Sequence, residues 1–311
     1  MEQANTSKSD TNRSLPKREG GGRVSNLIVR ALTGALFLVV MIGGMVWSTT
    51  SFALLFTVIT ALTLWEFCGL VNQQDGVDVN RLITTAAGTY LFQACFAGSA
   101  GFEGLSLPVL LLPWLITIIY LIVSELYLRH KQPLHCWAYT MWSQLYIALP
   151  FGLLPLLYFS YSWFLPLAVF IFLWCNDTGA YCTGSLLGRH KLFPRISPGK
   201  SWEGSIGGAV LCLIVSQVIA HWADWFGNAD ATSAAANGFG LTPLEWAGFA
   251  LVVVVFGTWG DLVESLFKRT LGVKDSGNIL PGHGGMLDRF DSSLLAIPTV
   301  VAYLLTLALA N

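Results

Sequence analysis

The sequence predicts an all-α, polytopic integral membrane protein with about nine transmembrane helices and a cytoplasmic amino terminus. Hydrophobic residues make up 54% of the 311 residues and charged residues only 11%, against about 25% charged in a typical soluble domain. The apolar residues form long runs, and Lys and Arg concentrate between particular pairs of runs. No soluble fold of this size could bury so much apolar surface, so the composition excludes an ordinary soluble enzyme, a disordered protein and a nucleic-acid-binding protein.

Nine apolar segments are expected to cross the membrane, since a helix needs about 20 apolar residues to do so. In chain order they are 27–47, 51–71, 82–102, 106–126, 137–159, 163–184, 205–226, 243–265 and 290–309. The segment 82–102 is rich in Gly, Ala and Thr and is the least clear of the nine. The first segment follows a 26-residue polar tail and has no small-residue cleavage site, so we expect it to remain as the first span.

The basic residues support this count, because cytoplasmic loops carry an excess of Lys and Arg. With the amino terminus inside, all 17 Lys and Arg fall on the cytoplasmic side: positions 8, 13, 17, 18, 23, 30, 81, 129, 131, 189, 191, 195, 200, 268, 269, 274 and 289. The loops on the opposite side carry Glu103, Asp224, Asp230 and Glu245. The carboxyl terminus is then expected outside.

The chain divides into three parts. Residues 1–26 read as a flexible basic cytoplasmic tail that sets orientation, 27–160 as an amino-terminal transmembrane scaffold, and 161–311 as a carboxyl-terminal catalytic region. The stretch 227–242 reads as an external loop. The six cysteines, at 68, 95, 136, 175, 182 and 212, show no CxxC or Cys/His metal spacing, and we predict free thiols rather than disulfides or metal ligands.

Charged side chains within membrane helices suggest a working site. Glu66 stands alone, and a packed or snorkelling role is as well supported as a functional one. A first polar cluster begins at Asn176, and Asp177, Ala180, Tyr181 and Gly184 follow at i, i+3, i+4 and i+7. That spacing puts a carboxylate, a phenol and small residues on one helical face, which suits a polar ligand better than simple helix packing.

A second cluster, Ser197-Pro198-Gly199-Lys200-Ser201-Trp202-Glu203-Gly204-Ser205, opens the seventh segment. Ser, Pro and Gly predict a turn, and Ser201 or Ser205 could cap the helix. Two interpretations of this cluster remain open. It is either a capped helix start with a snorkelling lysine or a phosphate-binding site at a helix amino terminus. A Walker loop is excluded, because Pro194 replaces its first glycine and no strand is expected before it.

The third cluster is the most specific. Asp261, Glu264, Ser265 and Lys268 share one helical face, and Asp288 and Asp291 share another at the start of the last segment. Between them lies a glycine-rich loop with further charged and polar residues: Arg269, Lys274, Asp275, His283, Gly284, Gly285 and Arg289. Carboxylates from two helices beside cations are typical of Mg²⁺-assisted phosphoryl chemistry, whereas the alternative is a salt-bridged loop.

These motifs resemble a known family. The run S-L-F-K-R-x4-K-D-S-G-x2-L-P-G-H-G-G-M-L-D-R-F-D, from Ser265 to Asp291, is similar at all 27 positions to the signature of the phosphatidate cytidylyltransferase (CDP-diacylglycerol synthase) family. The N-D-T-G-A-Y and S-P-G-K-S-W-E-G stretches also resemble family motifs, with Gly199 and Ser201 as departures from S-P-K-K-T-W-E-G. The clear resemblance covers roughly the last 140 residues.

The resemblance implies transfer of a cytidylyl group from CTP to phosphatidate, in the bacterial inner (plasma) membrane with the active site facing the cytoplasm. It implies Mg²⁺ at the metal ligands Asp261 and Asp288, a second cation such as K⁺, contact with membrane lipid, and a homodimer. The expected catalytic residues are Asp261, Asp288, Lys268, Arg269, Lys274, Asp275 and His283. The expected substrate-binding residues are Asn176, Asp177, Tyr181, Ser197, Lys200, Ser201, Glu203, Glu264, Ser265, Gly284, Gly285, Arg289 and Asp291.

Three alternatives remain. A secondary transporter would also use intramembrane carboxylates, but it would be expected to show paired repeats and a midplane site. A related CTP-using enzyme, such as a polyprenol kinase or an archaeal ether-lipid cytidylyltransferase, is disfavoured by the unbroken Ser265–Asp291 pattern. A catalytically inactive scaffold is disfavoured because the expected carboxylates and cations are all present.

Overall fold

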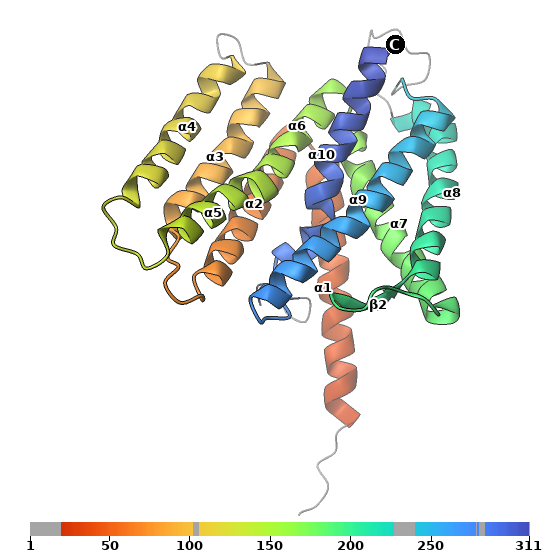
Figure 1. Cartoon of the computed structure of the whole chain (residues 1–311). Helices are drawn as coiled ribbons and strands as arrows, with labels where there is room; N and C mark the ends of the chain where they lie inside the picture. The colour runs from red at the N-terminus through yellow and green to blue at the C-terminus, as the bar shows by residue number, and fades with distance from the viewer. Residues whose placement is uncertain (1–19, 102–105, 227–239, 278, 280–283, 311) are drawn as a thin grey trace, which may run out of the picture.

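The structure, a computed structural model, describes residues 20–101, 106–226, 240–277, 279 and 284–310. These residues form a nearly all-helical bundle with one short β-hairpin (Figure 1). The helical runs are α1 (Gly20–Val46), α2 (Thr49–Val71), α3 (Arg81–Ala100), α4 (Leu107–Ser124), the continuous α5 (Pro133–Ser143), η1 (Gln144–Ala148) and α6 (Leu149–Ser160), then α7 (Phe164–Leu187), α8 (Trp202–Phe226), α9 (Pro243–Thr270) and α10 (Leu287–Ala310).

Each of the nine predicted segments falls on one of these helical runs. Within the described residues, seven runs are long and apolar enough to cross a membrane: α2, α4, α5 to α6, α7, the Trp202–Trp222 part of α8, α9 and α10. The described apolar part of α1 is shorter, Ala31–Val46, and α3 is not among the seven. A nearly all-α protein with several membrane-spanning helices is therefore confirmed, while the count of nine and the orientation of the amino terminus stay predictions.

Two local features add to or change the expectations. The helix that carries the first predicted segment begins at Gly20, so it includes residues that were assigned to the tail; the division of the chain into tail and scaffold stays a prediction. The expected turn at Ser197–Gly199 is instead a strand. Strand β2 (Ser197–Ser201) pairs antiparallel with β1 (Lys191–Phe193), with Lys191 opposite Ser201. Pro198 fits there because a two-stranded sheet has only edge strands.

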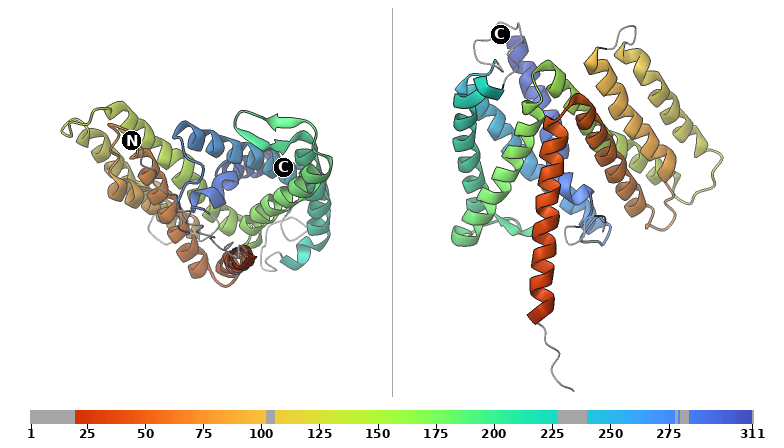
Figure 2. Two further views of the ribbon diagram at one scale, coloured as in Figure 1. Left: turned by 90° about the horizontal axis from the view of Figure 1, so that it is seen from below. Right: turned by 180° about the vertical axis from the view of Figure 1, so that it is seen from behind.

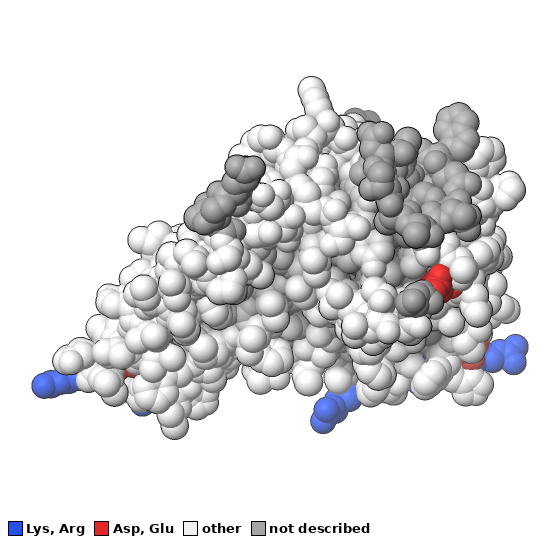
Figure 3. All heavy atoms as spheres, turned by 90° about the horizontal axis from the view of Figure 1, so that it is seen from above, with Lys and Arg blue, Asp and Glu red and all other residues white. Residues whose placement is uncertain are grey.

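The loops gather at two ends of the bundle. The loops 72–80, 125–132 and 188–201 and the described parts of the loop after α9, 271–277 and 284–286, lie at the lower end in Figure 1, where α1 also extends beyond the other helices (Figures 1 and 2). We call this the basic end, because the described Lys and Arg lie in or next to these loops, apart from Arg23 and Arg30 of α1. The opposite face is almost free of charge in the atoms that Figure 3 shows, and Lys and Arg appear only at its rim. The predicted charge asymmetry is therefore present.

Aromatic packing fixes the start of α10. Phe290 is 1% exposed and makes edge-on ring contacts with Phe151 of α6 and Phe170 of α7, at centroid distances of 5.5 and 5.9 Å. Phe37 of α1 contacts the same ring at 6.0 Å. Edge-to-face aromatic pairs are stabilising beyond the area that they bury. Helices from both halves of the chain thereby hold the turn that carries Asp288 and Asp291.

Glycine allows two helix pairs to approach closely. A Cβ added at Gly179 of α7 would lie 2.9 Å from the Cα of Gly208 in α8. A Cβ at Gly260 of α9 would lie 2.6 Å from the carbonyl oxygen of Asp291 in α10. Real Cβ atoms do not tolerate such distances, because protein interiors are close-packed. The second contact sets Asp261 beside the first turns of α10.

Candidate active site

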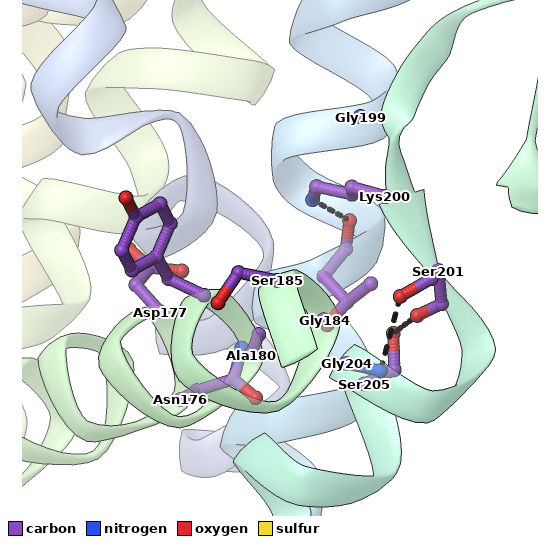
Figure 4. A pocket seen from close by; sticks show the side chains of 12 residues that line it. Asn176, Asp177, Ala180, Gly184, Ser185, Gly199, Lys200, Ser201, Gly204 and Ser205 are labelled. Carbon is purple, nitrogen blue, oxygen red and sulfur yellow. Dashed lines mark hydrogen bonds between the residues drawn. The ribbon is translucent and has the colours of Figure 1, made fainter. Parts of the chain in front are cut away.

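A pocket of about 360 Å³ opens between α7, β2, α8 and α9. Its lining includes Asp177, Ala180, Tyr181 and Gly184, which confirms that these four residues share one face of α7. The α7 residues lie on one side, and Lys200 and Ser201 of β2 lie on the other (Figure 4). We call this the hairpin pocket; its full lining is Asn176, Asp177, Ala180, Tyr181, Gly184, Ser185, Gly199, Lys200, Ser201, Gly204, Ser205 and Thr258.

The junction of β2 and α8 shapes this pocket. Ser201 is buried, and its Oγ accepts a hydrogen bond from the backbone N–H of Gly204 at 3.1 Å, which confirms Ser201 as the cap of α8. Lys200 reaches across the pocket, with its Nζ 2.6 Å from Asp261 Oδ2. The hairpin thus positions Lys200 to form an ion pair with Asp261 of α9.

A second cavity, of about 450 Å³, adjoins the first through Asp177, which lines both. Its polar part combines carboxylates from three helices with a cation: Asp177 of α7, Asp261 of α9, and Asp288, Asp291 and Arg289 of α10. Its other wall is mainly apolar: Phe37 and Leu38 of α1 and Phe170, Leu173 and Trp174 of α7. We call it the carboxylate cavity, and its chemistry suits a molecule with a charged head and an apolar body.

Asp288 is held by a dense set of partners. Its Oδ1 lies 2.6 Å from Lys268 Nζ, and its Oδ2 accepts hydrogen bonds from the backbone N–H groups of Ser276 and Gly285 at 2.9 and 2.8 Å. Lys268 Nζ also lies 2.6 Å from Glu264, whose side chain is fully buried. The expected glycine loop does approach an anion, and in this structure the anion is the Asp288 carboxylate.

Glu66 supports the same loop from the first half of the chain. It is 6% exposed, and its Oε2 accepts hydrogen bonds from the Leu287 N–H at 2.9 Å and from Ser276 Oγ at 3.4 Å. A Cβ added at Gly277 or Gly285 would clash with its carboxylate. Glu66 is thus not snorkelling: its Oε2 supports the loop, while its Oε1 has no hydrogen-bond partner among the described residues and the side chain lines a cavity of about 310 Å³. In the sequence, Glu66 is noticeable as a lone carboxylate in an apolar helix, but only the tertiary structure identifies its hydrogen-bond partners.

Asp261 is also supported within its own helix. Ser265 Oγ donates a hydrogen bond to Asp261 Oδ1 at 3.1 Å, so the two predicted site residues of α9 meet as their spacing requires. Among the described residues, Asp177 and Asp291 form no ion pair. The carboxylate cavity therefore contains two carboxylates held by lysines and two that are not.

Several predicted site residues do not line either cavity. Glu203, at the start of α8, accepts hydrogen bonds from the backbone N–H groups of Arg189 and His190 and lies 2.6 Å from the His190 ring. It therefore holds the chain that enters the hairpin. The others outside both linings are Ser197, Glu264, Ser265, Lys268, Arg269, Lys274, Asp275, Gly284 and Gly285. Arg269, Lys274 and Asp275 are exposed at the basic end, and His283 is outside the described residues.

The donors in the carboxylate cavity fit Mg²⁺. This ion prefers oxygen ligands and typically binds through one or two carboxylates together with substrate phosphate oxygens. Asp261 and Asp288 both line the cavity, and a carboxylate has about four acceptor positions, so neither is exhausted by the partners above. The structure therefore supports Mg²⁺ through the type of donor atom and its position, while the assignment of Asp261 and Asp288 as the ligands stays a prediction.

The comparison with known protein families decides the class of this chain. The cytidylyltransferase family matches residues 28–307. The chain belongs to this family. The cytidylyltransferase match includes every residue that lines either cavity, so the two cavities are features of the family region.

Individual relatives are more informative about chemistry. A protein of Staphylococcus aureus named phosphatidate cytidylyltransferase is 46% identical over 132 residues, which are 42% of this chain and 45% of the relative. A protein of Haemophilus influenzae with the same name is 43% identical over 135 residues, 43% of each chain. The chain thus matches less than half the length of these curated relatives.

Proposed function

We propose that this chain transfers the cytidylyl group of CTP to phosphatidate and forms CDP-diacylglycerol and pyrophosphate. The carboxylate cavity carries the proposal, because it joins four carboxylates and Arg289 to an apolar wall. A phosphate headgroup with acyl chains fits this cavity if Arg289 and a carboxylate-bound Mg²⁺ face the phosphate and the apolar wall faces the chains. The names of the relatives support the same substrate pair.

The proposed reaction needs no covalent enzyme intermediate. An oxygen of the lipid phosphate attacks the α-phosphorus of CTP in line; the new P–O bond forms as the bond from that phosphorus to the bridging α–β oxygen breaks. Pyrophosphate leaves with the bonding electrons. Catalysis then consists of positioning both substrates and neutralising the charge on their phosphates.

In this proposal the two cavities hold one substrate each. CTP occupies the hairpin pocket, where Asn176, Tyr181 and Lys200 can reach it. The phosphatidate headgroup occupies the carboxylate cavity near Arg289, with its acyl chains along the apolar wall. The shared residue Asp177 lies where the two substrates meet.

The charged residues then have distinct tasks. Asp261 and Asp288 would hold Mg²⁺, which when bound supplies positive charge beside the phosphates. Lys268 positions Asp288 through their 2.6 Å ion pair, and Lys200 supplies a positive charge between the two cavities. Because the basic residues gather at one end, we propose that this end faces the cytoplasm of a bacterial inner membrane. A homodimer and a second cation such as K⁺ remain expectations from the resemblance.

The first test is transfer of labelled cytidylyl groups by the purified full chain in detergent. With phosphatidate, CTP and Mg²⁺, we expect label in the lipid phase, and chelation of Mg²⁺ by EDTA should abolish it until Mg²⁺ is restored. Asp288→Asn should lower kcat/KM by about 10²- to 10³-fold, the scale of losing one electrostatic contact to the transition state.

Asp75→Asn is the matched control. Asp75 is an exposed aspartate at the same end of the bundle, paired with Lys131 and outside both cavities, so full activity is expected. Equal activity of the Asp288 variant and the wild type would overturn the role of Asp288 but keep the reaction. No label from folded wild type would overturn phosphatidate as acceptor, and other lipid acceptors would then be compared.

A further inference from the structure

A cluster of three potential metal ligands, a carboxylate, an imidazole and a thiol, lies outside both cavities at the basic end. Glu125 follows α4, His130 lies in the loop between α4 and α5, and Cys136 lies in the first turns of α5. One ligand atom from each, Glu125 O, His130 N and Cys136 Sγ, lies within 4.8 Å of the other two. In particular, His130 Nδ1 is 2.9 Å from Glu125 Oε2 and 3.9 Å from Cys136 Sγ.

The loop between α2 and α3 completes the surroundings. The backbone N–H of Asp78 donates to Cys136 Sγ at 3.4 Å, and the Asp78 carboxylate lies 3.7 Å from His130 Nε2. A histidine that binds metal through one ring nitrogen commonly directs its other nitrogen to a carboxylate. The Asp78 carboxylate lies on the Nε2 side of the His130 ring in the same way.

Burial favours an enclosed site over a solvated group of charges. Cys136 is 1% exposed, and the side chains of Glu125 and His130 are 8% and 19% exposed. Within the described residues, Glu125 has no Lys or Arg partner; its ion pair is with His130. The nearby Lys131 pairs with Asp75 instead. The cluster therefore contains a nearly buried carboxylate whose charge is not matched by a permanent cation.

We propose that Glu125, His130 and Cys136 bind a Zn²⁺ ion that clamps the α4–α5 loop beside the α2–α3 loop. Sulfur, imidazole and carboxylate donors all suit zinc, whereas the thiol and the imidazole are poor ligands for Mg²⁺, so this site is separate from the metal of the proposed reaction. With zinc bonds of about 2.0–2.3 Å in a tetrahedral arrangement, the His130 and Glu125 donors, now 2.9 Å apart, would separate slightly, and Cys136 Sγ would move closer to both. A water molecule takes the fourth position.

The wild-type full chain tests this directly. After loading with Zn²⁺ and removal of free metal, we expect one tightly held Zn²⁺ per chain by elemental analysis. Titration with Co²⁺ should produce thiolate-to-cobalt charge-transfer absorption, a signal that carboxylates alone do not give. Absence of that absorption in folded wild type would overturn the proposal without reference to any variant.

Variants then locate the ion. Cys136→Ser and His130→Ala should lose the held zinc and the cobalt absorption, and the exposed Asp78→Asn should lower zinc affinity about 10- to 100-fold. His135→Ala and Cys95→Ser are matched controls, because neither residue belongs to the cluster, and both should bind like wild type. Retention of the cobalt absorption by Cys136→Ser would overturn the site, as would its loss in the controls.

Discussion

At the scale of single residues, Glu66 links the two halves of the chain. Its carboxylate accepts hydrogen bonds from Leu287 and Ser276, which in turn contact Asp288. Glu66→Ala would leave the buried Leu287 N–H without an acceptor, which costs about 1–3 kcal/mol. We expect a lower melting temperature in detergent and reduced transferase activity.

Glu66→Gln is the informative comparison, because the amide keeps one acceptor oxygen at nearly the same position. It should lose less stability than the alanine variant. If both variants melt like wild type, the contacts of Glu66 contribute nothing measurable and the loop is held by its other partners.

At the scale of the element, the approach of α9 and α10 brings the carboxylates together. Gly260 leaves no room for a side chain, since an added Cβ would lie 2.6 and 2.9 Å from the carbonyl oxygens of Asp291 and Ser292. Gly260→Ala should push the helices apart and destabilise the protein by about 1–3 kcal/mol, the usual range for overpacking. Thermal melting and the CTP transfer assay check the two effects.

Gly43 provides the control, because a Cβ added there meets nothing within 4 Å. Gly43→Ala in α1 should leave both melting and activity near wild type, since Ala is also the better helix former. An undisturbed Gly260→Ala variant would contradict the argument that this contact limits the distance between α9 and α10.

At the scale of the whole molecule, the number of crossings can be tested by labelling. Asp75, before α3, and Leu244, at the start of α9, are both highly exposed. Five helical runs of the described chain lie between them, α3, α4, α5 to α6, α7 and α8, so the nine-span prediction puts the two positions on opposite sides. If α3 does not cross, they lie on the same side.

We therefore expect a membrane-impermeant maleimide to label Leu244→Cys in intact cells, and Asp75→Cys only in inverted vesicles. The labelling of the six native cysteines in the wild type is the background to subtract. Labelling of both variants from one side would reject nine spans, and the reverse pattern would reject a cytoplasmic basic end.

The sequence by itself determined the helical membrane class, the approximate helix positions and the polar faces. Helical periodicity is local, so Asp177 with Tyr181 and Asp261 with Ser265 could be paired from spacing alone, and both pairs are observed as expected. The cap at Ser201 followed from residue type in the same way. The 27-position motif also identified the family before any fold was considered.

Only the tertiary structure decided which of these faces meet. The number of residues between Asp177 and Asp261 does not predict their distance in space. Their shared cavity depends on the contact of Phe290 with Phe170 of α7 and on the close approach of α9 to α10 at Gly260. The partners of Glu66 and the contacts of Cys136 with Glu125 and Asp78 likewise join segments with no local pattern between them. Local rules act over a few residues, whereas such contacts arise from the packing of the whole chain.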